Sequence, residues 1–277
     1  MKSIVIKTRM LTFLTVFFLF TSCSEDENNT ELETNEDLTA MQTKQAADTD
    51  EVSTGAFNII ETAYVEIEEQ GGRMTSLFPD CVTITITSEN GFTFITLDFG
   101  LGCELNNGNI VSGKIHISYG PIQNGTRTIN YSFEDFIFNN KEIEGGGTIF
   151  REHSNAIGNP QSTFHKNIVV TFPEGLVATV DGTRVREWVE GVGSGTWMDN
   201  VYLVTGNWTI EFSTGHSRSA LVTEALRREA TCHYFVSGLL EITRNETTGV
   251  LNYGDGTCDN IAILTVNGKE YIIILQY

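Results

Sequence analysis

Hydrophobic and polar residues alternate with a period of two along most of the chain after Phe78. In residues 82–87, valine and isoleucine alternate with threonine, and in 114–119 Ile115, Ile117 and Tyr119 alternate with polar residues. This alternation is typical of β-strands that bury one face and expose the other. The pattern therefore predicts a β domain over residues 73–277.

Turn signals divide this domain into many strands. Asparagine–glycine or aspartate–glycine pairs occur at 90–91, 124–125, 181–182 and 267–268, where tight turns between antiparallel strands are expected. Extended stretches are predicted at 126–138, 142–152, 163–172, 176–189, 197–212, 238–244, 250–253, 260–266 and 270–275. The predicted fold class is mainly β: a curved antiparallel sheet, a β-sandwich or an open barrel, with one short N-terminal helix. Glycines 145–147 are expected to bend the sheet.

A different period precedes the strands. Phe57, Ile60, Ala63, Tyr64 and Ile67 recur at helical spacing, and two glycines follow at 71–72. This pattern predicts a short amphipathic helix over residues 55–72 that packs on one face of the sheet.

The first 22 residues have the organisation of an export signal. Lys2, Lys7 and Arg9 provide a basic start without acids, and residues 10–20 form a compact apolar run. The run is shorter than the roughly 20 residues that a transmembrane helix needs. The residues that end at Cys23 resemble the lipobox of bacterial lipoproteins, although Phe20 stands where that motif has an aliphatic residue. The resemblance implies that Cys23 is acylated and becomes the mature N-terminus, which anchors the protein to a lipid bilayer.

Residues 23–54 are predicted to form an acidic, solvated tether. They are rich in aspartate and glutamate and lack a hydrophobic period. Residues 24–27 (SEDE) resemble the acidic export signal of surface-exposed Bacteroidota lipoproteins. The expected location is the outer membrane, lipid-anchored, with exposure at the cell surface favoured over the periplasmic side.

The net charge of −19 disfavours some partners. A chain this acidic is repelled by nucleic acid and lacks the basic surface that a nucleic-acid-binding protein needs. We therefore expect no nucleic-acid partner.

Four cysteines remain besides Cys23, and in an exported protein an even number favours two disulfides. Three pairings exist. We predict Cys81–Cys103 and Cys232–Cys258, because each pair brackets a predicted hairpin. A zinc site is disfavoured because the chain has no Cys-x-x-Cys motif.

Two similar segments support a family resemblance. Residues 99–103 (FGLGC) and 254–259 (GDGTCD) each follow a predicted strand. With the leader and the acidic tether, they make the chain similar to a group of uncharacterised Bacteroidota lipoproteins. The resemblance implies an exported β domain and brings no known activity.

Candidate binding residues are few. Asp255, Asp259 and Asn260 could supply oxygen ligands to Ca²⁺ on a tight loop, but a glycine-enabled turn explains them as well. Otherwise no cofactor is expected. Trp188, Trp197 and Trp208 are candidates for an aromatic surface that stacks on a sugar or contacts a protein, with core packing as the ordinary alternative.

The sequence offers little support for catalysis. The five histidines are scattered, and Ser194 lacks the glycine that a nucleophile elbow requires two positions earlier. Paired carboxylates for glycoside hydrolysis remain an alternative, with Asp98, Glu104, Glu134 and Asp135 as candidates. We predict a lipid-anchored envelope lipoprotein whose β module binds a glycan, a lipid or a protein, or is structural. The alternative is a cell-surface polysaccharide hydrolase.

Overall fold

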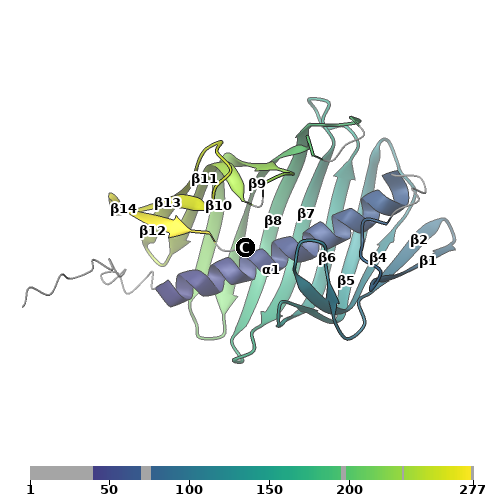
Figure 1. Ribbon diagram of the computed structural model, residues 1–277, viewed down its shortest axis with the longest axis horizontal. Helices are drawn as coiled ribbons and strands as arrows, with labels where there is room; N and C mark the ends of the chain where they lie inside the picture. The colour runs from purple at the N-terminus through teal and green to yellow at the C-terminus, as the bar shows by residue number, and fades with distance from the viewer. Residues whose placement is uncertain (1–39, 70–75, 195–197, 233, 276–277) are drawn as a thin grey trace, which may run out of the picture.

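The computed structural model describes residues 40–69, 76–194, 198–232 and 234–275. One helix, α1 (Ala40–Tyr64), continues into a short π-helical segment, η1 (Val65–Glu69), and is followed by fourteen strands (Figure 1). The strands are β1 (Thr83–Glu89), β2 (Phe92–Asp98), β3 (Cys103–Glu104), β4 (Ile110–Tyr119), β5 (Thr126–Phe138), β6 (Lys141–Glu152), β7 (Gln161–Thr171), β8 (Val177–Glu190), β9 (Val201–Phe212), β10 (Ser217–Glu229), β11 (Phe235–Arg244), β12 (Thr247–Asp255), β13 (Ile261–Val266) and β14 (Lys269–Ile274).

All of these strands belong to one antiparallel sheet with a simple meander topology. Each strand pairs with its neighbours along the chain, except that β2 pairs with β4, and the two-residue β3 adds to β4. The sheet remains open, so β1 and β14 are its two edges. The predicted curved antiparallel sheet is confirmed, and the sandwich alternative is not adopted.

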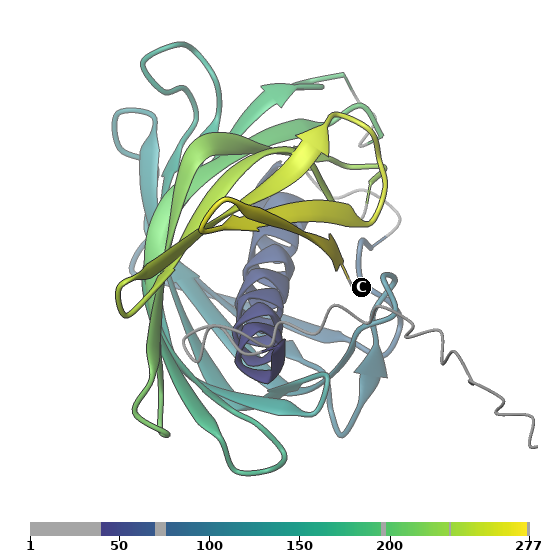
Figure 2. The same ribbon diagram turned by 90° about the vertical axis from the view of Figure 1, so that its left-hand side faces the viewer.

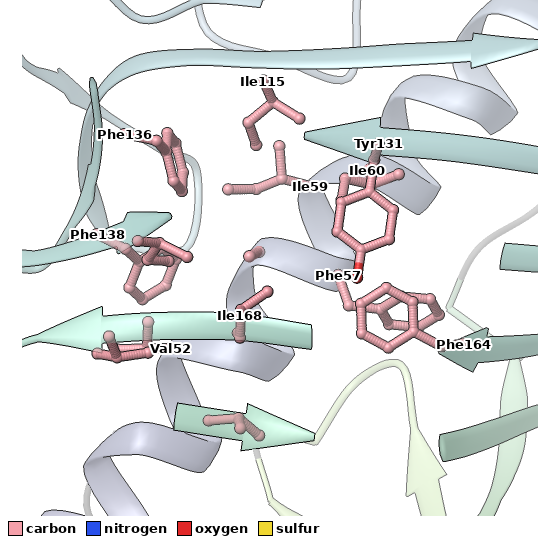
Figure 3. Packing of buried hydrophobic residues seen from close by; sticks show 14 of the residues in the cluster. Val52, Phe57, Ile59, Ile60, Ile115, Tyr131, Phe136, Phe138, Phe164 and Ile168 are labelled. Carbon is pink, nitrogen blue, oxygen red and sulfur yellow. The ribbon is translucent and has the colours of Figure 1, made fainter. Parts of the chain in front are cut away.

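The sheet curves around α1, which lies along its concave side (Figure 2). We call the face toward α1 the inner face and the opposite face the outer face. Inner positions on the strands, such as Ile115, Ile117 and Ile129, are buried, and polar residues alternate with them on the outer face. On the helix, Phe57 and Ile60 point into the same core (Figure 3). The helix thus packs against the inner face of the sheet, where a β-sandwich would have its second sheet.

The predicted start of the helix was wrong. The helix begins at Ala40, inside the stretch expected to be a solvated tether, and Ala46, Thr49, Val52 and Ser53 are buried. Small and polar side chains are typical of solvated segments, but here they face the inner side of the sheet. Residues 23–39 of the predicted tether lie outside the described residues.

Glycines allow close contacts at the helix–sheet interface and within the sheet. A Cβ at Gly55 of α1 would come within 2.2 Å of the Phe138 ring. In β6, a Cβ at Gly146 would lie 2.3 Å from the Tyr131 carbonyl oxygen, and one at Gly147 would lie 2.1 Å from that of His165. Side chains at these positions would force the neighbouring backbone apart. The glycine cluster at 145–147 therefore lies where the sheet has no room for a side chain.

Both predicted disulfides are present. Cys81 pairs with Cys103 around the β1–β2 hairpin, and Cys232 pairs with Cys258 around the β11–β12 hairpin. The Cα atoms of the two pairs are 5.6 and 5.8 Å apart. Each disulfide fastens one end of the sheet, near an edge that has strands on only one side.

Candidate functional site

The inner face of the sheet carries a row of buried cations as well as apolar residues. They occupy inner positions on six of the seven strands from β5 to β11, with none on β9, and lie on the face toward α1. The residues are Arg127 of β5, Arg151 of β6, Lys166 of β7, Arg184 of β8, Arg218 of β10 and Arg244 of β11. This row is absent from the residues predicted above, although the sequence contains a signal for it: Arg127 has the same strand parity as the buried Ile129 and Tyr131.

At the C-terminal end of the helical segment, Glu68 contacts one member of this row, Arg127, and also Tyr119 of β4. Its carboxylate lies 2.7 Å from Arg127 Nη1 and accepts a 2.8 Å hydrogen bond from the Tyr119 hydroxyl. Burial opposes ionisation of Glu68, but the hydrogen bond from Arg127 leaves its pKa below the usual value. Burial and the bond to Glu68 also raise the pKa of the Tyr119 hydroxyl. Tyr119 therefore remains a neutral donor, and the contact serves to position the helix.

In the middle of the helix, Glu61 binds Arg151 and Ser162. Arg151 Nη1 lies 3.2 Å from Glu61 Oε2 and donates a 2.9 Å hydrogen bond to the Ser162 hydroxyl, which in turn donates to Glu61 Oε1 at 3.1 Å. All three residues are buried. These three residues bond to one another and thereby join α1 to β6 and β7.

Near the N-terminal half of the helix, cations outnumber the acid that they surround. Lys166 Nζ donates a 2.9 Å hydrogen bond to Ser53, Arg184 donates to Thr54, and the Arg184 guanidinium lies 4.4 Å from the Trp208 ring centroid. Asp50, whose Oδ1 is buried, lies among Lys166, Arg184 and Arg218. Burial raises the pKa of Asp50 despite these cations. Burial and repulsion by Arg184 lower the pKa of Lys166 to about 7. Burial at this end of the helix therefore disfavours the charged forms of both Asp50 and Lys166.

The outer face carries a second polar cluster, over β2, β4 and β5. Thr96 Oγ1 lies 3.2 Å from His116 Nδ1, and His116 Nε2 lies 2.8 Å from Glu134 Oε2. Glu134 also accepts a 2.7 Å hydrogen bond from Lys114 Nζ. The order hydroxyl, imidazole, carboxylate matches a nucleophile, base and orienting acid. Here it lies half-exposed on a sheet surface, and the lysine also holds the carboxylate.

The carboxylates considered for glycoside hydrolysis serve other purposes. The bonds from Lys114 and His116 lower the pKa of Glu134, whereas a general acid needs a raised pKa. Asp98 accepts a 2.8 Å hydrogen bond from the Gly100 amide. Asp135 sits at a bulge in β5 with a φ of 49°. Glu104 is exposed in β3. These residues stabilise ion pairs, turns and a bulge.

The predicted calcium residues lie at the end of β12, where Asp255 is the last residue, and on the exposed loop to β13. Asp255 accepts hydrogen bonds from the amide and hydroxyl of Thr257, at 3.2 and 2.9 Å, and these bonds lower its pKa. Asp259 accepts a 2.9 Å bond from the Ile261 amide, and the Asn260 carbonyl accepts a 2.8 Å bond from the Leu275 amide. Each aspartate holds its own turn. No group of three or more acidic, histidine or cysteine residues in the described chain is arranged to hold a metal ion.

The two tryptophans within the described residues do not form an exposed surface. Trp208 is buried on the inner face below Lys166 and Arg184. Trp188 is half-buried, 6.0 Å from the Tyr202 ring, and its indole N–H donates to the Glu190 carbonyl at 2.6 Å. Trp197 and Cys23 lie outside the described residues.

Two hollows are found on the outer face, and neither contains paired acids. One lies over β6–β8 and includes Thr148, His165, Asp181 and Thr183. The other lies over β9–β11 and includes Thr209, Ser219, Glu241 and Thr243. Each therefore offers one carboxylate with hydroxyl groups.

No protein-family model, curated protein or solved structure matches the chain. Among the residues that the structure describes, no helix has the length and apolar character needed to cross a membrane.

Proposed function

We propose that this chain is a lipid-anchored, non-catalytic module of the bacterial envelope, with an outer face that serves in binding or in structural support. The observation that carries the proposal is the position of α1 within the concave side of the sheet (Figure 2). A curved sheet of this kind has its natural ligand cavity on that side. Here the space is occupied by the protein's own side chains, among them Phe57, Ile60 and Tyr64.

The polar groups on the inner face also support this proposal. Glu61 and Glu68 bind Arg151 and Arg127, so these carboxylates are engaged in holding the helix. A partner of the folded protein would therefore contact the outer face or an edge of the sheet. The lipobox resemblance at Cys23 and the acidic residues after it support the address, because together they would hold the domain away from the bilayer.

The first prediction tests the absence of catalysis. Purified protein is expected to hydrolyse none of a panel of polysaccharides and esters above background, because the hydrogen bonds with Lys114 and His116 keep the pKa of Glu134 below its usual value. Glu134→Gln and Thr96→Val should behave like the unchanged protein. Glu174→Gln, in an exposed turn, is the matched control. Turnover that is lost in Glu134→Gln but retained in Glu174→Gln would establish the hydrolase alternative.

The second prediction tests the anchor. Cys23→Ala should move the protein from the membrane fraction to the soluble fraction, because the acyl chains provide the attachment. Metabolic labelling with a fatty acid should mark the unchanged protein and not the variant. Cys232→Ser controls for general effects of losing a cysteine and should stay in the membrane fraction. If the Cys23→Ala protein still sediments with membranes, the lipobox interpretation is wrong.

A further inference from the structure

The two edges of the sheet differ in the side chains that they present. β14 and β1 lie at opposite ends of the molecule (Figure 1). The outer face of β1 consists of Thr83, Thr85, Thr87 and Glu89. On the next strand, β2, Phe94 and Phe92 lie beside Thr87 and Glu89 and are 43% and 48% exposed. Beside β14, the outer face carries isoleucines on both the edge strand and its neighbour, with Glu270 and Thr265 near the turn. The two edge strands thus differ in their own outer side chains, which are polar on β1 and mainly isoleucine on β14.

The apolar edge is made of two cross-strand pairs. Ile261 of β13 lies opposite Ile274 of β14, and Ile263 lies opposite Ile272. These four side chains are between 39% and 74% exposed. The other side of β14 packs inward, since Tyr271 and Ile273 contact the core. The strand is thus held in place while its outer isoleucines are in water.

The backbone of β14 is also open to pairing. In the described chain β14 pairs with β13 alone, so its second side offers unpaired N–H and C=O groups. Proteins commonly protect such an edge with proline, a bulge or charges along the strand. β14 has no proline, its pairing with β13 is regular, and its charges, Lys269 and Glu270, are confined to the end beside the turn.

We propose that the β14 edge joins a second copy of this chain, edge to edge and antiparallel, to form a two-fold symmetric dimer with a continuous sheet. The two-fold axis passes at Ile273, so that Ile272 of one copy lies opposite Ile274 of the other. Each half of the interface then forms a row of four isoleucines: Ile263 and Ile272 of one copy followed by Ile274 and Ile261 of the second. In the register centred on Ile272, Glu270 would lie opposite Ile274, which is less favourable.

The charge distribution favours a second copy at this place. The whole chain carries a net charge of −19, which opposes contact between copies over most surfaces. The β13–β14 hairpin, Ile261 to Ile274, contains one lysine and one glutamate and no other charged residue. The same neutral, apolar strand can meet itself across a two-fold axis, as symmetric dimer interfaces require. The dimer does not depend on acylation of Cys23 or on the proposed function.

The test is cysteine cross-linking of the full-length protein in the cell envelope. Ile273→Cys places a thiol on the proposed axis, where it would meet its own copy at a distance suited to a disulfide. The expected result is a reducible species of twice the monomer mass, identified by mass spectrometry as two copies joined at residue 273. Thr85→Cys, on the β1 edge, is the matched control and should remain monomeric.

A second substitution tests the isoleucine rows. Ile272→Lys in the Ile273→Cys background should lower the cross-linked fraction at least about tenfold, because the two-fold axis introduces the lysine twice. If that variant does not accumulate, Ile274→Thr, which keeps strand propensity, should lower it in the same direction.

Three results would overturn the proposal. The first is a monomer with Ile273→Cys although a maleimide reagent modifies the thiol. The second is equal cross-linking of Thr85→Cys, and the third is a cross-link from residue 273 to a different protein.

Discussion

Replacement of Lys166 by methionine is expected to stabilise the protein by about 2–4 kcal/mol at pH 7. Lys166 lies on the inner face of β7, 3% exposed, beneath α1 and 5.2 Å from the Trp208 ring. Burial and repulsion by Arg184 lower its pKa from 10.5 to about 7, and attraction by Asp50 offsets only part of this. Methionine fills similar space without the cost of burying a charge. The loss of the bond to Ser53 reduces the gain.

The same substitution should change the pH dependence of stability. Between pH 7 and 10.5, Lys166 is protonated in more of the unfolded molecules than of the folded ones. The free energy of unfolding therefore rises with pH over this range. From pH 7 to 9 the rise attributable to Lys166 is about 2 kcal/mol. Below pH 7 both states are protonated and the cost of the buried charge is constant. Lys166→Met should remove this slope.

Urea unfolding followed by tryptophan fluorescence at pH 7 and pH 9 measures both effects. The Cys23→Ala background leaves no free thiol for disulfide exchange at pH 9, since the other four cysteines are paired. Lys114→Met is the control, because Lys114 lies on the outer face and its bond to Glu134 raises its pKa instead. A loss of stability in Lys166→Met would show that the lysine is net favourable where it is.

Replacement of Phe57 by alanine is expected to destabilise the protein by about 3–5 kcal/mol. Phe57 of α1 is buried against the sheet, and its ring lies 4.3 Å from that of Phe164. The Phe164 ring is stacked on Tyr131 at 5.3 Å. Rings from the helix, β7 and β5 thus form one continuous group (Figure 3). Truncation would leave a space that these strands cannot close without bending.

Asn58→Ala is the matched control for Phe57→Ala. Asn58 is the next residue of the helix, is exposed, and makes one 3.5 Å side-chain contact with Arg186. We expect it to change stability by less than about 0.5 kcal/mol. Chemical denaturation of both variants provides the comparison. A loss of less than about 1 kcal/mol in the free energy of unfolding for Phe57→Ala would contradict the packing of α1 against the concave side of the sheet.

The packing of α1 determines which surfaces of the protein are available for its proposed role. A helix that occupies the concave side through aromatic packing and buried ion pairs leaves the outer face and the two edges for other molecules. The edges are unlike, because β1 presents threonines and β14 presents isoleucines.

The strands and the disulfides could be predicted from the sequence because their signals are local. Alternation with period two marks which side chains point inward, and asparagine–glycine pairs such as 267–268 mark the turns. The turn expected at the aspartate–glycine pair 181–182 was wrong, since this pair lies within β8 and is paired on both sides. The cysteine pairs are each separated by about one hairpin, so the correct pairing followed from the strand pattern. In an antiparallel meander, neighbours in sequence are neighbours in space, and the topology required little further information.

Only the tertiary structure decided what the sheet encloses. Thr49 and Ser53 are polar, and together with the acids around them they indicated solvated chain, yet both are buried on α1. Ser53 accepts a hydrogen bond from Lys166, and the adjacent Thr54 accepts one from Arg184; both cations are more than 100 residues away in the sequence. The charge of a segment reports whether it can be buried only when the opposing surface is known. That surface forms when the sheet curves, because curvature brings the inner positions of seven consecutive strands, β5 to β11, toward one helix.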